Sequence, residues 1–147
     1  MSDFFKVLLR VRYSECDAQS VVFNARYGDY VDLVATEYLR ALFGGYEDLL
    51  AQGIDNQVVR LAIDWKAPAK FDDVLAASVE TLRVGNTSYT LKIDFTNHLT
   101  QTAIASAELT CVMVTPDEHQ KMSIPDDFRA RILAGANGKV YNYAGIE

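Results

Sequence analysis

Hydrophobic and polar positions alternate in the first part of the chain, between residues 5 and 13. The apolar members of this alternation are Phe5, Val7, Leu9, Val11 and Tyr13. The opposite face carries Lys6, Arg10 and Arg12. A period of two predicts a β-strand with one face on a core. Residues 14–22, which follow, are predicted to form a loop with a short turn.

The period changes at Arg26, where apolar residues begin to recur at spacings of three and four. They are Tyr27, Tyr30, Val31, Val34, Ala35, Tyr38, Leu39 and Leu42. This spacing predicts an amphipathic helix whose wide apolar face packs on a sheet. Asn24 is its expected N-cap, and Gly44 and Gly45 mark its expected end. A second, short helix is predicted over residues 46–52.

The rest of the chain is mainly predicted to form strands. Four are expected, over residues 58–65, 74–84, 87–96 and 102–115. Gly85 and Asn86 give a tight-turn signal between the second and third of them. Pro116 ends this pattern, and a short helix is predicted over residues 124–134. The tail, residues 135–147, has little periodicity and is expected to be loosely ordered or docked on a neighbour.

The order of one strand, one long helix and four strands predicts an α+β domain. At 147 residues, the chain is expected to form a single domain over 1–147. Ala103, Ala105 and Ala107 share one strand face, where small side chains would let a helix approach closely. One helix cannot cover both faces of a five-stranded sheet, so a second copy is expected to pack alongside.

Composition and charge narrow the classes of function. Half of the residues are hydrophobic and 23% are charged, which is usual for a soluble protein. The net charge of −6 argues against general nucleic-acid binding, which needs a basic footprint. No segment is long and apolar enough to span a membrane, and the first residues do not resemble a signal peptide. A cytoplasmic location is therefore expected.

The cysteines and histidines do not indicate a metal or redox centre. Cys16 and Cys111 are expected to be reduced thiols. Cys16 could act as a nucleophile beside Asp17, but neither His98 nor His119 is near it in sequence to serve as a base. The histidines lack metal-ligand spacing, and no P-loop or dinucleotide motif is present. No metal or cofactor is expected.

The most informative stretch is RYSECDAQSVVFNARY, residues 12–27. It places Asp17 in a loop that leads into the predicted long helix. The first N–H groups of a helix are unpaired and carry a partial positive charge. A carboxylate beside them could act as a base or nucleophile while the N–H groups hold a developing oxyanion. The alternative interpretation is that Asp17 only caps a turn, and nearby Glu15 is expected to be a solvated loop acid.

This stretch, together with the order of the elements, resembles the hotdog fold and, within it, the 4-hydroxybenzoyl-CoA thioesterase-like acyl-CoA thioesterases. The positions that match the family motif are Arg12, Tyr13, Asp17, Val22, Asn24, Ala25 and Tyr27. A second match is WKAPAKFDDVL, residues 65–75, in which Pro68 and Asp73 occupy family positions. The chain carries Ser20 and Asp72 where the family often has glycine.

The resemblance implies a five-stranded antiparallel sheet wrapped around one long central helix. It implies hydrolysis of an acyl-CoA to a free acid and CoA, by a homodimer or homotetramer with its site at the subunit interface. The catalytic residues would be Asp17, as base or nucleophile, and Asn24, near which a backbone N–H would hold the oxyanion. Substrate contacts are expected from Val22, Phe23, Tyr27, Lys66 and Lys70. Coenzyme A would enter only as part of the substrate.

Several assignments have alternatives. Tyr27 and Tyr30 could line an acyl pocket or belong to the core. Other basic residues could bind the CoA phosphates or simply be solvated: Arg60, Arg83 and Lys92. Two further functions are also considered, a hydratase and a non-catalytic module that binds acyl-CoA or acyl-carrier protein. A hydratase usually needs an Asp and His pair, and no histidine lies near Asp17.

Overall fold

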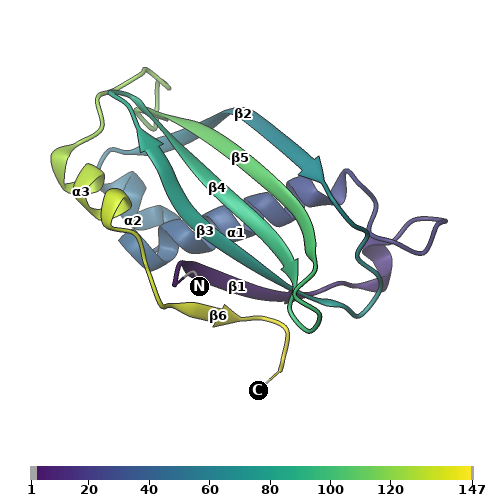
Figure 1. Cartoon of the computed structure of the whole chain (residues 1–147). Helices are drawn as coiled ribbons and strands as arrows, with labels where there is room; N and C mark the ends of the chain where they lie inside the picture. The colour runs from purple at the N-terminus through teal and green to yellow at the C-terminus, as the bar shows by residue number, and fades with distance from the viewer. Residues whose placement is uncertain (1–2, 147) are drawn as a thin grey trace.

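A curved sheet wraps around one long helix in the computed structural model, which describes residues 3–146 (Figure 1). The helices are α1 (Arg26–Phe43), α2 (Tyr46–Ala51) and α3 (Asp126–Ala134). The strands are β1 (Phe5–Arg10), β2 (Asp55–Trp65), β3 (Val74–Val84), β4 (Ser88–Asn97), β5 (Ala103–Val114) and β6 (Val140–Asn142). They form one sheet in the order β2-β5-β4-β3-β1-β6. The predicted α+β class is confirmed.

Helix α1 packs its apolar face against the inner face of the sheet. Its buried residues are Tyr27, Tyr30, Val31, Val34, Ala35 and Tyr38, which is most of the predicted apolar stripe. Ala77, Ala105 and Ala107 on the sheet are at most 2% exposed. Small side chains therefore do lie in the buried face, but Ala103, predicted to share it, is exposed.

The start of α1 differs from the prediction. The N-cap is Ala25, in a helical conformation and without a side-chain hydrogen bond, so the prediction of Asn24 as N-cap was wrong. The N–H of Tyr27 instead donates to the backbone oxygen of Asn24 at 3.3 Å, and the N–H of Arg26 donates to the oxygen of Phe23 at 2.8 Å. A backbone turn leads into the helix, and this turn replaces the expected side-chain cap.

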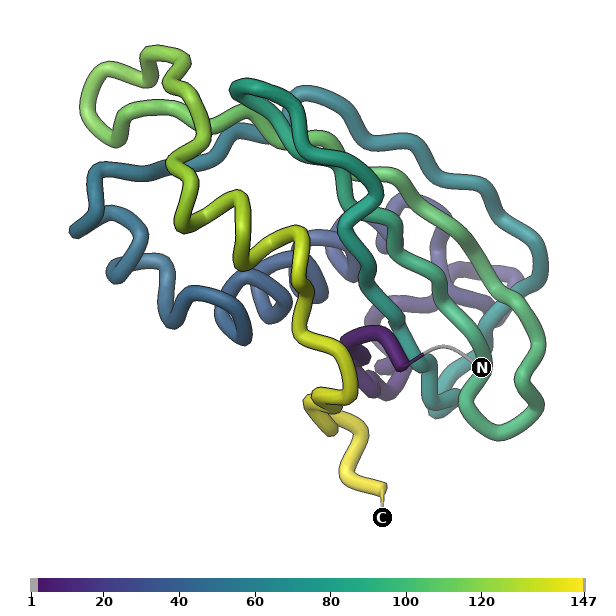
Figure 2. The backbone as a smooth tube through the Cα atoms, turned by 60° about the vertical axis from the view of Figure 1, so that its left-hand side comes forward, coloured from purple at the N-terminus to yellow at the C-terminus, as the bar shows by residue number. Residues whose placement is uncertain are grey.

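The prediction of five antiparallel strands was short by one. Residues 140–142 form β6, which pairs in parallel with β1 from Lys6 to Leu8. Three residues are too few to show a period of two, so the sequence pattern did not reveal this strand. Tyr141 packs edge-to-face on Phe5 with ring centroids 5.1 Å apart. Figure 2 shows the C-terminal segment running from α3 along this side of the molecule.

The two edges of the sheet are therefore unlike one another. β6 covers the outer edge of β1, whereas β2 is the last strand on the other side. Apolar side chains of β2 are exposed over much of their surface: Val58 58%, Val59 59%, Leu61 40% and Trp65 53%. Edge strands normally avoid such residues because they template pairing with another chain. Within residues 3–146, no helix is long and apolar enough to cross a membrane.

Candidate active site

Asp17 lies in a tight loop that closes on itself. Its N–H donates to the backbone oxygen of Val21, and its own backbone oxygen accepts the N–H of Ser20, both at 2.9 Å. One carboxylate oxygen accepts the N–H of Gln19 at 2.8 Å. Ser20 has a φ of 67°, a left-handed conformation in which glycine is unstrained. The loop thus keeps the backbone path that a glycine would favour, and it holds Asp17 half-buried.

Loop, helix start and sheet enclose a pocket of about 340 Å³ beside Asp17. Its lining residues are Asp17, Gln19, Val21, Val22, Asn24, Tyr27, Trp65, Ala67 and Pro68. The structure therefore brings together four of the predicted site residues. The other three, Phe23, Lys66 and Lys70, are exposed nearby and do not line this pocket.

Two backbone N–H groups just before α1 are unpaired within the described residues. The N–H groups of Val22, Phe23 and Arg26 donate to backbone oxygens at 2.8–2.9 Å, and those of residues 27 and 28 do so at 3.2–3.3 Å. The N–H groups of Asn24 and Ala25 donate to no acceptor among residues 3–146. Both residues are exposed, so these two N–H groups can bind an oxygen of a ligand.

Glu15 is not the solvated acid that the sequence predicted. It is 7% exposed, and its carboxylate is fully engaged. One oxygen accepts the N–H of Arg12 at 2.8 Å and the hydroxyl of Tyr30 at 2.9 Å. The other accepts Nε and Nη2 of Arg12, each at 3.1 Å. The three-residue spacing between Arg12 and Glu15 was the one sequence signal for this ion pair.

Tyr27 belongs to both the core and the pocket. It is 2% exposed and meets Tyr30, Trp65 and Phe95 edge-to-face, with ring centroids 5.6–6.4 Å apart. Burial, followed by the charge of Asp73, raises the pKa of Tyr27 to about 12. The structure therefore confirms Tyr27 as a core residue that also lines the cavity beside Asp17, and its hydroxyl stays neutral near pH 7.

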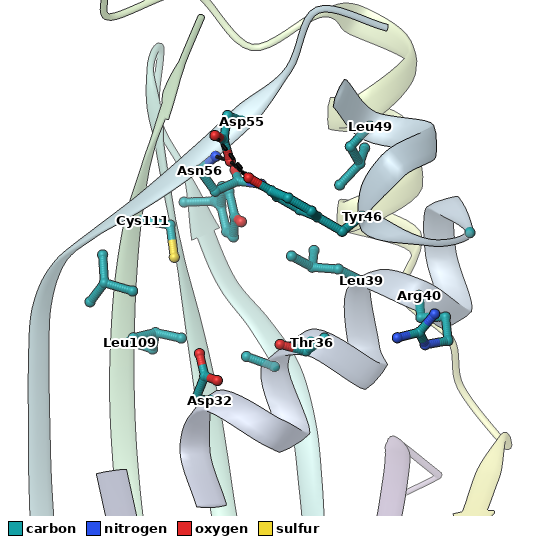
Figure 3. A pocket seen from close by; sticks show the side chains of 14 residues that line it. Asp32, Thr36, Leu39, Arg40, Tyr46, Leu49, Asp55, Asn56, Leu109 and Cys111 are labelled. Carbon is teal, nitrogen blue, oxygen red and sulfur yellow. Dashed lines mark hydrogen bonds between the residues drawn. The ribbon is translucent and has the colours of Figure 1, made fainter. Parts of the chain in front are cut away.

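A second cavity, of about 200 Å³, lies between α1, α2, β2 and β5 (Figure 3). Tyr46 reaches across it and donates its hydroxyl to the carboxylate of Asp55, with both oxygens at 3.0 Å. Cys111 lines the cavity, and burial raises the pKa of its thiol to about 11. Asp55 begins β2, whereas Trp65 in the Asp17 pocket ends it, so the two cavities lie at opposite ends of this strand.

The remaining charged candidates lie away from both cavities. Arg60 and Arg83 approach Glu108 at 3.6 and 4.0 Å, and Lys92 approaches Asp94 at 3.8 Å. The Arg60 pair joins the neighbouring strands β2 and β5, the Arg83 pair reaches from β3 to β5, and Lys92 and Asp94 both lie on β4. None of these basic residues lines the Asp17 pocket. Among residues 3–146, no group of three His, Cys, Asp or Glu side chains could hold a metal ion.

Known proteins resemble this chain in both sequence and structure. Residues 19–103 match the family model of the thioesterase superfamily. The acyl-CoA thioesterase YbgC of Haemophilus influenzae is 32% identical over 109 residues, which is 74% of this chain and 80% of the relative. The acyl-CoA thioester hydrolase YbgC of Escherichia coli O6:H1 is 28% identical over 121 residues, which is 82% of this chain and 90% of the relative.

The structural likeness extends over most of the chain. A solved thioesterase-superfamily protein from Jannaschia sp. superposes with a TM-score of 0.81 at 22% identity, over 90% of this chain and 92% of that protein. At this identity the likeness concerns the fold alone. Together with the sheet wrapped around α1, it confirms the predicted hotdog fold.

Proposed function

The chain belongs to the thioesterase superfamily, and on that premise we propose that it is an acyl-CoA thioesterase whose catalytic carboxylate is Asp17. It is a thioester hydrolase, as its relatives named YbgC are. The observation that carries the proposal is the pocket where Asp17 lies beside the start of α1, at which the N–H groups of Asn24 and Ala25 donate to no acceptor in the described part of the chain.

These groups suit attack on a thioester carbonyl. Asp17 either attacks the carbonyl carbon or removes a proton from a water that attacks it. The electron pair of the C=O bond moves to oxygen, where the N–H groups of Asn24 and Ala25 stabilise the charge. The intermediate then collapses and expels the CoA thiolate, a good leaving group. Attack by Asp17 leaves an anhydride that water must cleave, whereas attack by water gives the free acid directly.

We further propose that the working unit is a homodimer joined along β2. Its exposed apolar residues and unpaired edge support this, because β6 already covers the opposite edge of the sheet. Antiparallel pairing of two β2 strands would bring the Asp55 end of one copy beside the Trp65 end of the other. The cavity in Figure 3 would then adjoin the Asp17 pocket of the second copy and extend it for the acyl group.

The substrate enters from the exposed side of the pocket. Val22 and Tyr27 line the reacting end. Phe23, Lys66 and Lys70 are exposed around it, where they can contact the pantetheine and phosphates of coenzyme A. In this proposal coenzyme A is part of the substrate, and the chemistry uses no separate cofactor.

The test is thiol release from acyl-CoAs of several chain lengths and from an aromatic acyl-CoA. We expect Asp17→Asn to lower kcat by at least about 100-fold, the scale of losing one essential group at such a site. Asp29→Asn is the matched control, because its side chain is 72% exposed in the first turn of α1. Full activity in Asp17→Asn would refute the mechanism. Binding of acyl-CoA without turnover by the wild type would favour the non-catalytic alternative.

The same protein can separate the two roles of Asp17. A single turnover in ¹⁸O-labelled water that labels the Asp17 carboxylate and releases unlabelled acid identifies Asp17 as the nucleophile, because water has then cleaved the anhydride at the aspartyl carbonyl. Label found only in the released acid shows that water attacked the acyl carbon.

A further inference from the structure

We propose that Glu15 and Tyr30 are a positioning pair that fixes the position of Asp17 relative to the oxyanion donors. The inference rests on the proposed function, because it assumes that Asp17 and the N–H groups of Asn24 and Ala25 do the chemistry. Its basis is a hydrogen-bond network centred on the buried carboxylate of Glu15, two residues before Asp17.

Glu15 joins three segments of the chain through its own atoms. Its carboxylate binds Arg12, just beyond β1, and the hydroxyl of Tyr30, in the second turn of α1. Its backbone oxygen accepts the N–H of Phe23 at 2.9 Å. Glu15 thus ties together three segments: the end of β1, the far end of the Asp17 loop, and α1.

Both halves of the site depend on that residue. Asp17 is two residues after Glu15. Cys16, between them, forms an isolated antiparallel β-bridge with Val22 through its backbone. Asn24, which carries the first free N–H, directly follows Phe23. A change at Glu15 therefore displaces Asp17 and the donors relative to one another, and misplacement by about 1 Å can cost about 100-fold in rate.

The network is suited to fixing geometry. Glu15 is 7% exposed, and charge-assisted hydrogen bonds to a buried carboxylate are short and directional. The ring of Tyr30 is held independently, by Tyr27 edge-to-face at 5.6 Å and by Phe95 at 6.2 Å. Burial and the hydrogen bond to Glu15 raise the pKa of Tyr30 far above its usual value, so its hydroxyl remains a donor wherever the enzyme is assayed.

The decisive variant is Tyr30→Phe, which removes one hydroxyl and leaves the ring packing in place. Its matched control is Tyr38→Phe, two turns further along α1. Tyr38 is 1% exposed, and its hydroxyl bonds Thr81 Oγ1 at 2.8 Å, away from the Asp17 loop. A purely structural role predicts that the two variants behave alike.

We expect Tyr30→Phe to lower kcat by about 10-fold to 100-fold with KM changed by less than about twofold, since misplacement slows the chemical step more than binding. Tyr38→Phe should leave kcat and KM as in the wild type while losing a similar amount of thermal stability. Glu15→Gln, which keeps the size of the side chain, should show the same kcat loss. The double variant should be little worse than the poorer single variant, because the two residues act as a unit.

Equal kcat values for Tyr30→Phe and Tyr38→Phe would overturn the inference, and so would an effect confined to KM. If Tyr30→Phe does not fold, Glu15→Gln carries the same comparison. Asp17→Asn, measured alongside, separates this result from the proposed function. An inactive Asp17→Asn with a fully active Tyr30→Phe refutes the positioning pair alone, whereas an active Asp17→Asn refutes both.

Discussion

Leu61→Glu should dissociate the dimer proposed along β2. Leu61 lies next to the middle of β2 and pairs in register with Leu109 on β5, on the side of the sheet that faces α1. It is 40% exposed in the single chain. Fully burying a leucine contributes about 1.5–3 kcal/mol, so burying the remaining two-fifths contributes about 1 kcal/mol in each copy.

In a symmetric dimer each substitution is present in both copies, so its effect on the free energy of dimerisation is doubled. Leu61→Ala should therefore weaken the dimer by about 2 kcal/mol, or about 30-fold in Kd. Leu61→Glu should weaken it by more than about 1,000-fold, because each copy would bury an unpaired carboxylate at a cost of several kcal/mol. The two new carboxylates would also lie near the symmetry axis, where they repel one another.

Sedimentation velocity over a range of concentrations measures this Kd directly. The control is Leu99→Glu, which adds the same charge at a leucine that is 89% exposed in the turn between β4 and β5. Thiol release, measured below and above the new Kd, should fall with the dimer population, since the site is proposed to need both copies. A Leu61→Glu protein that keeps the wild-type Kd would refute the β2 interface, and an active monomer would refute the shared site.

Two further predictions follow from the shifted pKa values. Stability should fall as pH rises from about 10 towards 12, because an unfolded tyrosine ionises near pH 10 while the pKa of Tyr27 is about 12 in the folded protein. The unfolded state therefore ionises first, which lowers its free energy relative to that of the folded state. Urea midpoints at pH 8, 10 and 11 measure the fall, Tyr27→Phe should flatten it, and an unchanged slope in that variant would contradict the assignment. Iodoacetamide at pH 8 should modify Cys16, which is partly exposed, before Cys111, whose burial raises its pKa to about 11. Mass spectrometry should find one adduct on the native protein and two after unfolding; rapid native labelling of Cys111 would contradict its burial.

Regular strands with one buried face could be predicted from the sequence. β3 spans residues 74–84 as predicted, since its alternate residues enter the core. β2 begins three residues earlier than predicted, at Asp55, because its first residues are polar and carry no apolar signal. β6 was missed for a different reason: its pairing partner is β1, more than 130 residues away in the chain, and a local pattern cannot report such a contact.

The candidate site was only partly predictable from the sequence. The placement of Asp17 before a helix is local information, and the structure brings it into one pocket with Val22, Asn24 and Tyr27. The burial of Glu15 is not local, because it requires the hydroxyl of Tyr30, fifteen residues later. An acid in a polar loop is usually solvated, and that rule fails here because a distant partner satisfies the carboxylate.

The error at Asn24 has a physical cause that bears on the proposed chemistry. Its residue type favours an N-cap, but the N–H of Phe23 is committed to Glu15 and the chain then enters α1 through a backbone turn. The helix consequently begins after Ala25, and the N–H groups of residues 24 and 25 fall between the last bond of the loop and the first bond of the turn. These two N–H groups remain unpaired within the described residues because the loop and the first turn of the helix form their backbone hydrogen bonds without them. The backbone hydrogen bond from the N–H of Phe23 to Glu15 thus accounts for two findings: Asn24 is not the N-cap, and the proposed oxyanion donors remain available.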